Sequence, residues 1–220
     1  MCDDEKRILK IISVNFVIGL LLIIFIDACE LKIIGSKMDN LDSIYLAITI
    51  KTIIAIVIYI ISIHGLTKLF NKKLNFEYMT GLYSRRKLFI DLNDLISNNS
   101  EFTLCYIDFN NLKVVNDNYG HTAGDMLINE FSRRICLLKS QKVVGYRIGG
   151  DEFIVIIKDK QEKESCLENI WKITEEDVKV TSNKALKISF TMGVVDNDFV
   201  STVEELLIKA DSIMYKNKRG

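Results

Sequence analysis

The sequence predicts an α/β domain of the α+β type, with a mixed or antiparallel central sheet flanked by helices, preceded by a two-helix transmembrane hairpin. Two long apolar stretches near the N-terminus predict the membrane helices. In the rest of the chain, short β-branched runs alternate with segments of helical periodicity. The resulting order of strand, helix, hairpin, helix, strand and helix is typical of a sheet with helices on its faces.

The apolar stretches at 11–26 and 43–66 are long enough to cross a membrane once flanking residues are included, and only Lys51 interrupts the second. We therefore expect spans at about 8–28 and 43–66. A signal peptide, or a pair of buried core helices, would show similar apolar segments. Two spans are favoured because no clear cleavage site follows the first segment and the second segment comes soon after it.

Basic residues indicate the topology, because they gather before the first span and after the second. The positive-inside rule then places both ends in the cytosol. The flanking residues are Lys6, Arg7, Lys10, Lys68, Lys72 and Lys73, against Lys32 and Lys37 in the loop. The loop 27–42 is too short to fold independently. We expect a transmembrane hairpin over 1–66, a linker over 67–76 and a globular domain over 77–220.

Composition argues against two classes of protein. The 220 residues carry 29 basic and 29 acidic side chains, and this balance gives no support for a nucleic-acid partner. The cysteines have no paired spacing, which indicates reduced thiols and neither a disulfide framework nor a zinc site. They are Cys2, Cys29, Cys105, Cys136 and Cys166.

Helices of the globular part are predicted from apolar residues at helical spacing over 82–96, 122–138 and 162–176. A last helix opens at Ser201, where Glu204 completes a capping box. The residues expected to face the core are Leu127, Phe131, Ile135 and Leu138 in one helix and Leu207, Ala210 and Met214 in the last.

Strands are predicted over 102–107, which ends at Asp108, and over 186–195. Two further apolar runs flank Gly149-Gly150 and predict a β-hairpin. A hairpin tip without side chains lets the backbone approach a phosphate, and the acids that follow it can hold a divalent cation. The alternative is a plain hairpin whose glycines supply positive φ and whose acids face water.

An acid at the end of a strand, as Asp108 is, can be solvated or can ligate a metal. Asp151 on the hairpin could meet it if the two strands are neighbours. Two carboxylates from separate strands are what a Mg²⁺-assisted phosphoryl or nucleotidyl transfer needs.

Four segments in order resemble the GGDEF family, the diguanylate cyclases. Residues 149–153 match the signature letter for letter, and 108–125 is similar to DxDxFKxxND…GHxxGD, with Asn110 and Leu112 departing. Residues 77–86 resemble the entry DxLTGLxNRR and 210–218 the closing ADxALYxAK helix. Departures in the entry are Glu77, Met79 and Ser84. The resemblance covers roughly 77–220 and implies a nucleotidyl-cyclase-like fold.

The resemblance also implies a site for GTP with Mg²⁺ or Mn²⁺. Asp151 or Glu152 would help to activate the 3′-hydroxyl of GTP. The implied ligands are Asp108, Asp151 and the Phe109 carbonyl for the metal, Asn111, Leu112, Lys113 and Lys218 for phosphate, and Asn116 and Asp125 for guanine. An amide and a carboxylate can read the edge of a base. The alternatives are a turn residue for Asn116 and a helix cap for Asp125, within Thr122-x-x-Asp125.

Two further family features differ here. The product-inhibition motif RxxD falls on Ser140 and Val143, so we expect no inhibitory site. The family also has an arginine four residues beyond the position of Lys218, which the sequence to Gly220 does not include, and Arg219 is a candidate substitute.

The sequence therefore predicts a membrane-anchored bacterial signalling enzyme that condenses two GTP molecules to cyclic di-GMP. It would be a multi-pass protein of the inner (plasma) membrane, with both termini and the GGDEF domain in the cytoplasm. Because each domain holds one GTP, the active form would be a homodimer through the GGDEF domain, with the membrane helices as a second candidate contact. A silent GTP-binding scaffold, or a cyclase that acts on one GTP, are the alternatives.

Overall fold

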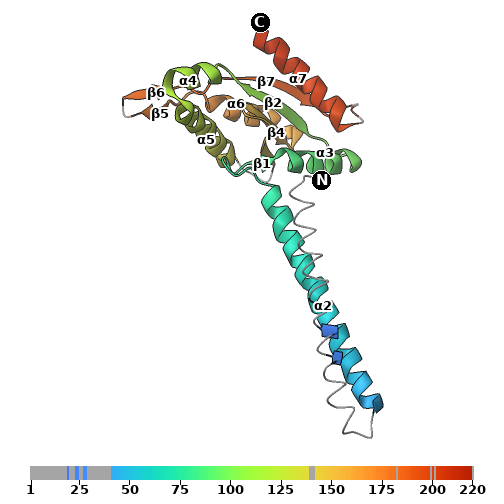
Figure 1. The fold of residues 1–220 in the computed structure, drawn as a ribbon. Coiled ribbons are helices and arrows are strands. Elements are labelled where there is room, and N and C mark those ends of the chain that lie inside the picture. Colours follow the sequence, from blue (N-terminus) through green and yellow to red (C-terminus); the bar gives the residue numbers. More distant parts are fainter. Residues whose placement is uncertain are drawn as a thin grey trace. The chain divides into compact units, whose positions relative to one another are not determined.

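The structure is a computed structural model that describes Gly19, 23–24, 27–28, 41–138, 142–181, 183–198, Val200 and 202–219. It divides into two compact units, residues 1–71 and residues 72–220, which are coloured by position along the chain in Figure 1. Each unit is described separately below.

The first unit is dominated by helix α2, Leu41–Leu74. Its stretch Ile48–Lys68 is long and apolar enough to cross a membrane, and none of that stretch is buried. The predicted first span, 8–28, lies outside the described residues except for Gly19, 23–24 and 27–28. Helix α2 continues to Leu74, so most of the predicted linker 67–76 is helical.

The second unit is built on a five-stranded sheet with the order β1-β3-β4-β2-β7. The β1 and β3 strands are parallel and the other neighbours are antiparallel, which confirms the predicted mixed sheet. The strands are β1 Tyr83–Ser84, β2 Thr103–Phe109, β3 Val143–Arg147, β4 Glu152–Ile157 and β7 Phe190–Asp196, and a separate ribbon is formed by β5 Val178–Thr181 and β6 Lys184–Leu186.

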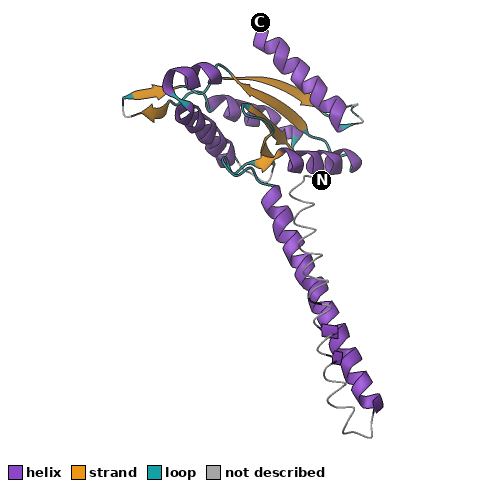
Figure 2. Ribbon diagram, in the orientation of Figure 1, coloured by secondary structure: helices purple, strands orange, loops and turns teal. Residues whose placement is uncertain are grey.

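Helices cover both faces of this sheet (Figure 2). They are α3 Arg85–Ser97, α4 Leu112–Tyr119, α5 His121–Leu137, the 3₁₀ turn η1 Lys160–Glu162, α6 Lys163–Lys172 and α7 Val203–Arg219. Side chains alternate between the faces of β2, as they must in a strand. Cys105 and Ile107 therefore join the core under α5 and α6, while Leu104 and Tyr106 join the core under α3 and α7.

Helix α7 lies directly on β7, because Gly193 leaves it room. A Cβ at Gly193 would overlap the Ala210 carbonyl oxygen and the Met214 amide nitrogen. Further along α7, the Asn217 amide donates to the Met192 carbonyl at 2.9 Å. These two contacts fix the C-terminal half of α7 against the edge of the sheet.

The predicted elements differ from the observed ones in several places. The expected strand 186–195 is interrupted, since β6 ends at Leu186 and β7 begins at Phe190. The expected helix 162–176 ends at Lys172, and helix α4 was not predicted. Ser201 lies outside the described residues, and Thr202 accepts a hydrogen bond from the Glu205 amide at 3.2 Å at the start of α7.

The predicted hairpin is present as β3 and β4, but its glycines do not act as a plain turn would require. Among the described glycines, positive φ occurs at Gly81 and Gly120 and at neither Gly149 nor Gly150. The interpretation of the pair as a source of positive φ is therefore wrong. At Gly149 the reason for glycine is space, because a Cβ there would lie 2.5 Å from Glu152 Oε2.

Candidate active site

The site is built around the end of β2. The register between β2 and β4 puts Asp108 directly opposite Glu152, so both carboxylates project from the same face of the sheet. The Asp108 side chain is only 15% exposed. From the sequence, Asp151 on the hairpin could meet Asp108 if the two strands are neighbours, and the pairing of β2 with β4 shows that they are.

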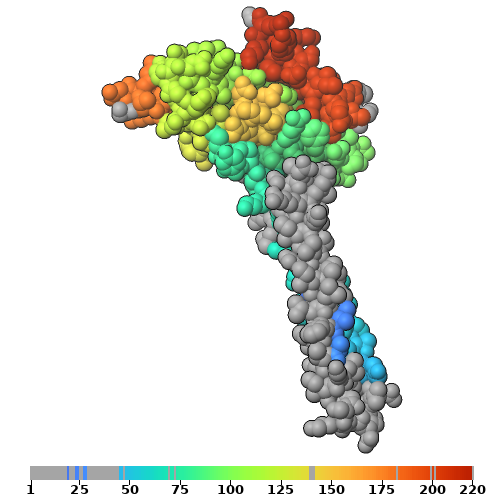
Figure 3. All heavy atoms as spheres, in the orientation of Figure 1, coloured from blue at the N-terminus to red at the C-terminus, as the bar shows by residue number. Residues whose placement is uncertain are grey.

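Lys218, expected to bind phosphate, forms an ion pair with Asp108. Helix α7, which carries this lysine, stands at the surface of the domain (Figure 3), and the Lys218 side chain is 38% exposed. A cation therefore sits on the carboxylate that was predicted to hold a metal. Asp108 is thus placed to interact with positive charge, and the structure brings these two predicted residues together.

The hairpin tip is held by Arg147. Its guanidinium donates to the Gly149 carbonyl at 3.1 Å and to the Gly150 carbonyl at 2.8 Å. The same side chain lies 3.3 Å from Glu77 Oε2. Arg147 thus links the entry segment to the tip, and Asp151, which follows the tip, is exposed while its carbonyl accepts from the Phe109 amide at 3.0 Å.

Glu77 differs from the family's entry pattern, and its carboxylate accepts several hydrogen bonds. Its carboxylate accepts from the Thr80 amide at 2.8 Å and the Thr80 hydroxyl at 2.6 Å. Partial burial alone would raise the pKa of Glu77. The hydrogen bonds from Thr80 and Met79 and the positive charge of Arg147 outweigh the effect of burial, so the pKa is lowered. Glu77 therefore stays ionised and keeps its pairing with Arg147.

Glu152 has a partner that the sequence analysis missed. The Tyr106 hydroxyl donates to Glu152 Oε1 at 2.9 Å. Burial, followed by the Glu152 carboxylate, raises the pKa of the Tyr106 phenol, so the hydroxyl remains protonated and able to donate. The sequence does indicate that Tyr106 is near the site, because Tyr106 and Asp108 are two residues apart in a strand and so lie on one face.

Asn110, which replaces the second aspartate of the family motif, ties the end of β2 to the start of β7. Its amide nitrogen donates to Ser189 Oγ at 3.1 Å, and its oxygen accepts from the Thr191 hydroxyl at 2.9 Å. Its backbone N–H donates to the Ser189 carbonyl at 2.9 Å. Asn110 therefore has a structural role, because it connects the end of β2 to β7 beside the site.

The predicted phosphate ligands lie at the start of helix α4. Asn111 is its N-cap residue in the left-handed region, with φ 57°, and makes no side-chain capping hydrogen bond. The first backbone N–H groups of a helix have no partner within the helix, and they favour anions. Leu112 is buried and anchors this turn in the core, whereas the Lys113 side chain is exposed.

Asn116 lies on α4 against Gly124 of α5. Its Oδ1 is buried, and among the described residues it is the buried side-chain oxygen that lacks a hydrogen-bond partner. A Cβ at Gly124 would overlap this oxygen. Asn116 is helical, so its interpretation as a turn residue is wrong.

Asp125 is exposed in the first turns of α5, one residue after Gly124. The N-cap of α5 is Gly120, and no side-chain capping hydrogen bond is made there. The capping interpretation of Asp125 is therefore wrong. The structure brings the two predicted guanine ligands to facing helices, and their role in reading the base stays a prediction.

The donor set suits a Mg²⁺ ion that is completed by its substrate. Within the part of the chain that the structure describes, no three His, Cys, Asp or Glu side chains gather at one point. A Mg²⁺ ion bound here would be coordinated by carboxylates at the ends of β2 and β4, by a backbone carbonyl and by oxygens of a nucleotide. Mg²⁺ is often bound in this way, through one or two carboxylates plus substrate phosphates.

The position of the family's inhibitory motif is only partly described, since Ser140 lies outside the described residues. Val143 is buried in β3. The neighbouring Lys142 is held in ion pairs with Asp159 at 2.8 Å and Glu162 at 2.9 Å. The nearby cation is thus neutralised by acids.

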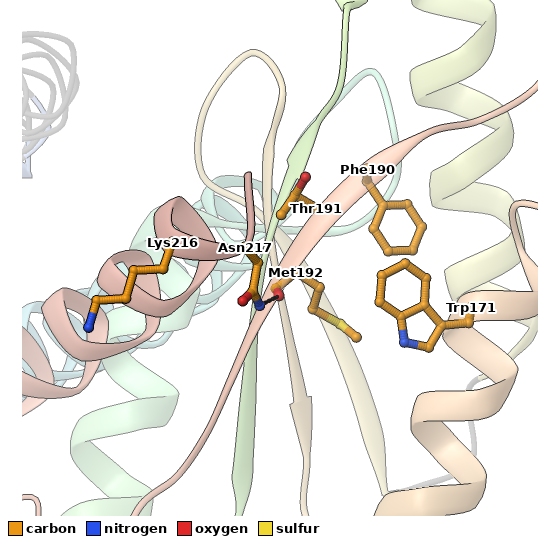
Figure 4. Close-up of a pocket in the computed structure, with 6 residues that line it drawn as sticks. All are labelled: Trp171, Phe190, Thr191, Met192, Lys216 and Asn217. Atoms are coloured by element: carbon orange, nitrogen blue, oxygen red, sulfur yellow. Dashed lines mark hydrogen bonds between the residues drawn. The ribbon is translucent and has the colours of Figure 1, made fainter. Parts of the chain in front are cut away.

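A hollow of about 560 Å³ lies beside β7, and none of the predicted site residues lines it. Figure 4 shows the Trp171 and Phe190 rings next to each other and the Lys216 side chain pointing away from them. The two rings are nearly parallel, with centroids 5.0 Å apart. The Asn217 amide in the same view reaches the backbone of Met192. The site's carboxylates do not line this hollow, although Thr191, which does, is the sheet partner of Asp108.

Comparison with known proteins decides the family. The model of the family described as "Diguanylate cyclase, GGDEF domain" matches residues 74–220, more than half of the chain. The chain belongs to the GGDEF family. Its departures at Glu77, Asn110 and Leu112 are thus variations within a GGDEF domain.

Curated relatives cover the same part. The chain is 33% identical to the diguanylate cyclase VdcA of Vibrio cholerae over 149 residues, which cover 65% of this chain and 44% of VdcA. It is 28% identical to the probable diguanylate cyclase DgcF of Escherichia coli over 170 residues, covering 72% of this chain and 53% of DgcF. The chain therefore spans about half the length of these curated relatives.

Solved structures share the fold. A sensory box/GGDEF family protein from Caulobacter crescentus is 28% identical, with a TM-score of 0.57 over 66% of this chain and 98% of that one. The Pseudomonas aeruginosa diguanylate cyclase SiaD, solved with its activator SiaC, has a TM-score of 0.64 over 97% of this chain and 85% of SiaD. At 21% identity, SiaD supports the GGDEF fold alone.

The overlap at Gly124 generates a prediction in this GGDEF domain. Gly124→Ala should lower stability by about 1–3 kcal/mol, because the added methyl displaces the Asn116 carboxamide. It should also weaken GTP binding, because that carboxamide is a predicted guanine ligand. Urea unfolding and GTP titration measure the two effects.

The double variant Asn116→Ala/Gly124→Ala is the control. The three atoms nearest to the added Cβ all belong to Asn116, so removing that side chain leaves helix propensity as the main effect, which favours Ala over Gly by about 1 kcal/mol. Gly124→Ala should therefore stabilise the Asn116→Ala protein while destabilising the wild type. The same sign in both backgrounds would contradict the argument.

Proposed function

We propose that this GGDEF domain is a diguanylate cyclase. The 3′-oxygen of one GTP attacks the α-phosphorus of a second, a new P–O bond forms, and the bond to the β-phosphate breaks to release pyrophosphate. A second, reciprocal attack closes the ring, so two GTP give cyclic di-GMP and two pyrophosphates. The hydroxyl proton of each attack passes to a carboxylate of the hairpin, Asp151 or Glu152.

One observation carries the proposal: Asp108, Glu152 and Lys218 converge at the end of β2, in a domain of this family. Carboxylates beside a lysine suit a reaction in which a polyphosphate with its cation binds and a hydroxyl is deprotonated. The N-terminus of α4 and Lys113 supply further donors for phosphate oxygens. Asn116 and Asp125 would select guanine through the edge of the base.

Asp108, Asp151 and the Phe109 carbonyl would hold Mg²⁺ or Mn²⁺, which when bound neutralises triphosphate charge and lowers the pKa of the attacking hydroxyl. The residues of the chain do the rest. Lys218 leaves Asp108 for the phosphates of the nucleotide, and Arg147 keeps the hairpin tip in place through the Gly149 and Gly150 carbonyls.

The reaction requires two nucleotides, and each domain offers one site. We therefore propose a homodimer in which two GGDEF domains face each other. The membrane helices would bring the two chains together, with both termini on the cytoplasmic side.

The second candidate is a GTP-binding module without turnover. The cyclic di-GMP phosphodiesterase PdeB of Shewanella oneidensis is 36% identical over 89 residues, which are 40% of this chain and 10% of PdeB. A segment like this one therefore also occurs in a protein named for a different activity. A module of this kind would bind GTP and release no product. A cyclase that acts on one GTP would release a cyclic mononucleotide, which product mass distinguishes.

Removing a carboxylate tests the proposal. The purified chain, incubated with GTP and Mg²⁺, should form cyclic di-GMP, and Asp151→Ala and Asp108→Asn should each lower turnover by about 100-fold or more, because anionic ligands are lost. Mass spectrometry identifies the product. Circular dichroism should show both variants folded; a folded Asp151→Ala protein with wild-type turnover would contradict the assignment.

The inhibitory motif gives a second prediction. Lys142 is neutralised by Asp159 and Glu162, and a lysine lacks the forked geometry that grips phosphate in two places. Micromolar cyclic di-GMP should therefore leave the initial rate unchanged at saturating GTP. Strong non-competitive inhibition that Lys142→Ala removes would contradict this expectation.

The location is also proposed: a multi-pass protein of the bacterial inner membrane. Helix α2 supports it, since its apolar stretch Ile48–Lys68 is exposed. The chain should sediment with membranes after an alkaline wash. A phosphatase that is active only outside the cytoplasm should be inactive when it is fused to either terminus. Release of the chain by the wash would contradict membrane insertion.

A further inference from the structure

We infer that Tyr106 is a positioning residue for the reaction, acting through Glu152. This inference rests on the proposed function and adds a residue to it. The Tyr106 hydroxyl is 2.9 Å from Glu152 Oε1, and the pair joins β2 to β4 on the face that also carries Asp108.

The second oxygen of Glu152 occupies space that a glycine leaves free. A Cβ at Gly149 would lie 2.5 Å from Glu152 Oε2 and 3.3 Å from Glu152 Cβ, so the carboxylate folds back against the backbone of the hairpin tip. Oε1 is held by a hydroxyl and Oε2 lies against a glycine. Tyr106 therefore holds the carboxylate in this orientation, and Gly149 leaves the space that the orientation needs.

The position of Tyr106 makes it a rigid support. The side chain is 8% exposed and belongs to the core under α3 and α7. Its ring is therefore fixed by packing, and its hydroxyl reaches the edge of the core where Glu152 begins β4. A buried donor that holds a carboxylate in this way preorganises it for proton transfer at a fixed geometry.

A purely structural tyrosine would have the same burial, and the sheet offers a matched example. Tyr146 on β3 is fully buried in the same core, and its hydroxyl donates to Asp91 Oδ2 at 2.7 Å. Asp91 lies on α3 and belongs to none of the predicted ligand sets. Tyr146→Phe therefore removes an equivalent hydrogen bond without touching the site.

The experiment compares Tyr106→Phe with Tyr146→Phe in the full chain. Tyr106→Phe should lower kcat by about ten- to a hundredfold, with KM for GTP changed by less than about twofold, because misorientation of a reacting group affects the chemical step. Tyr146→Phe should lower the midpoint of urea unfolding and leave kcat within about twofold.

A double-mutant cycle supplies a readout that does not depend on turnover. The unfolding midpoints of Tyr106→Phe and Glu152→Ala should be non-additive, because both remove the same hydrogen bond. Equal kcat for Tyr106→Phe and Tyr146→Phe, or additive midpoints, would overturn the role of Tyr106 while leaving the cyclase assignment intact. A wild-type protein that forms no cyclic di-GMP would overturn the proposed function itself, and the positioning role with it.

Discussion

The register between β2 and β4 is the constraint on which the site depends. Side chains alternate along a strand, so the pairing of Asp108 with Glu152 also decides that Tyr106 lies on the same face as both. A slip of one residue between the two strands would put Glu152 on the opposite face from Asp108 and Tyr106. The apolar residues on both faces of β2 oppose such a slip, because it would exchange acids for core side chains.

Strand β2 pairs with a strand on each side, and these pairings fix the position of its end. It pairs with β4 on one edge and β7 on the other, and Asn110 continues the connection to β7 beyond the last pair. Helix α7 is fixed to β7 at Gly193 and at Asn217, and the next residue after Asn217 is Lys218. The ion pair between Lys218 and Asp108 therefore follows from packing around one strand.

The departures from the family pattern have structural explanations here. Ser84 is the N-cap of α3, accepting from the Lys87 amide at 3.4 Å, and its hydroxyl donates to the Leu74 carbonyl at 2.8 Å. Leu112 fills the core in place of an aromatic residue. Glu77 reaches both Thr80 and Arg147. Each replacement makes a contact that orders the segments around the site.

Much of the site could be predicted from motif spacing. The Gly-Gly pair between two β-branched runs indicated the hairpin, and the acid after an apolar strand indicated Asp108, because both signals are local in sequence. Lys218 was named from the resemblance alone. Helix α4 was not predicted because it has only eight residues, and short helices depend on tertiary packing for stability.

The sequence by itself determined the mixed sheet with helices on its faces, the hairpin and the family, because periodicity and spaced motifs are carried by neighbouring residues. Only the tertiary structure decided that Glu152 faces Asp108, that Tyr106 holds Glu152, and that Asn116 needs a glycine at Gly124. These contacts join strands and helices whose register and approach are set by packing, and no local pattern records them.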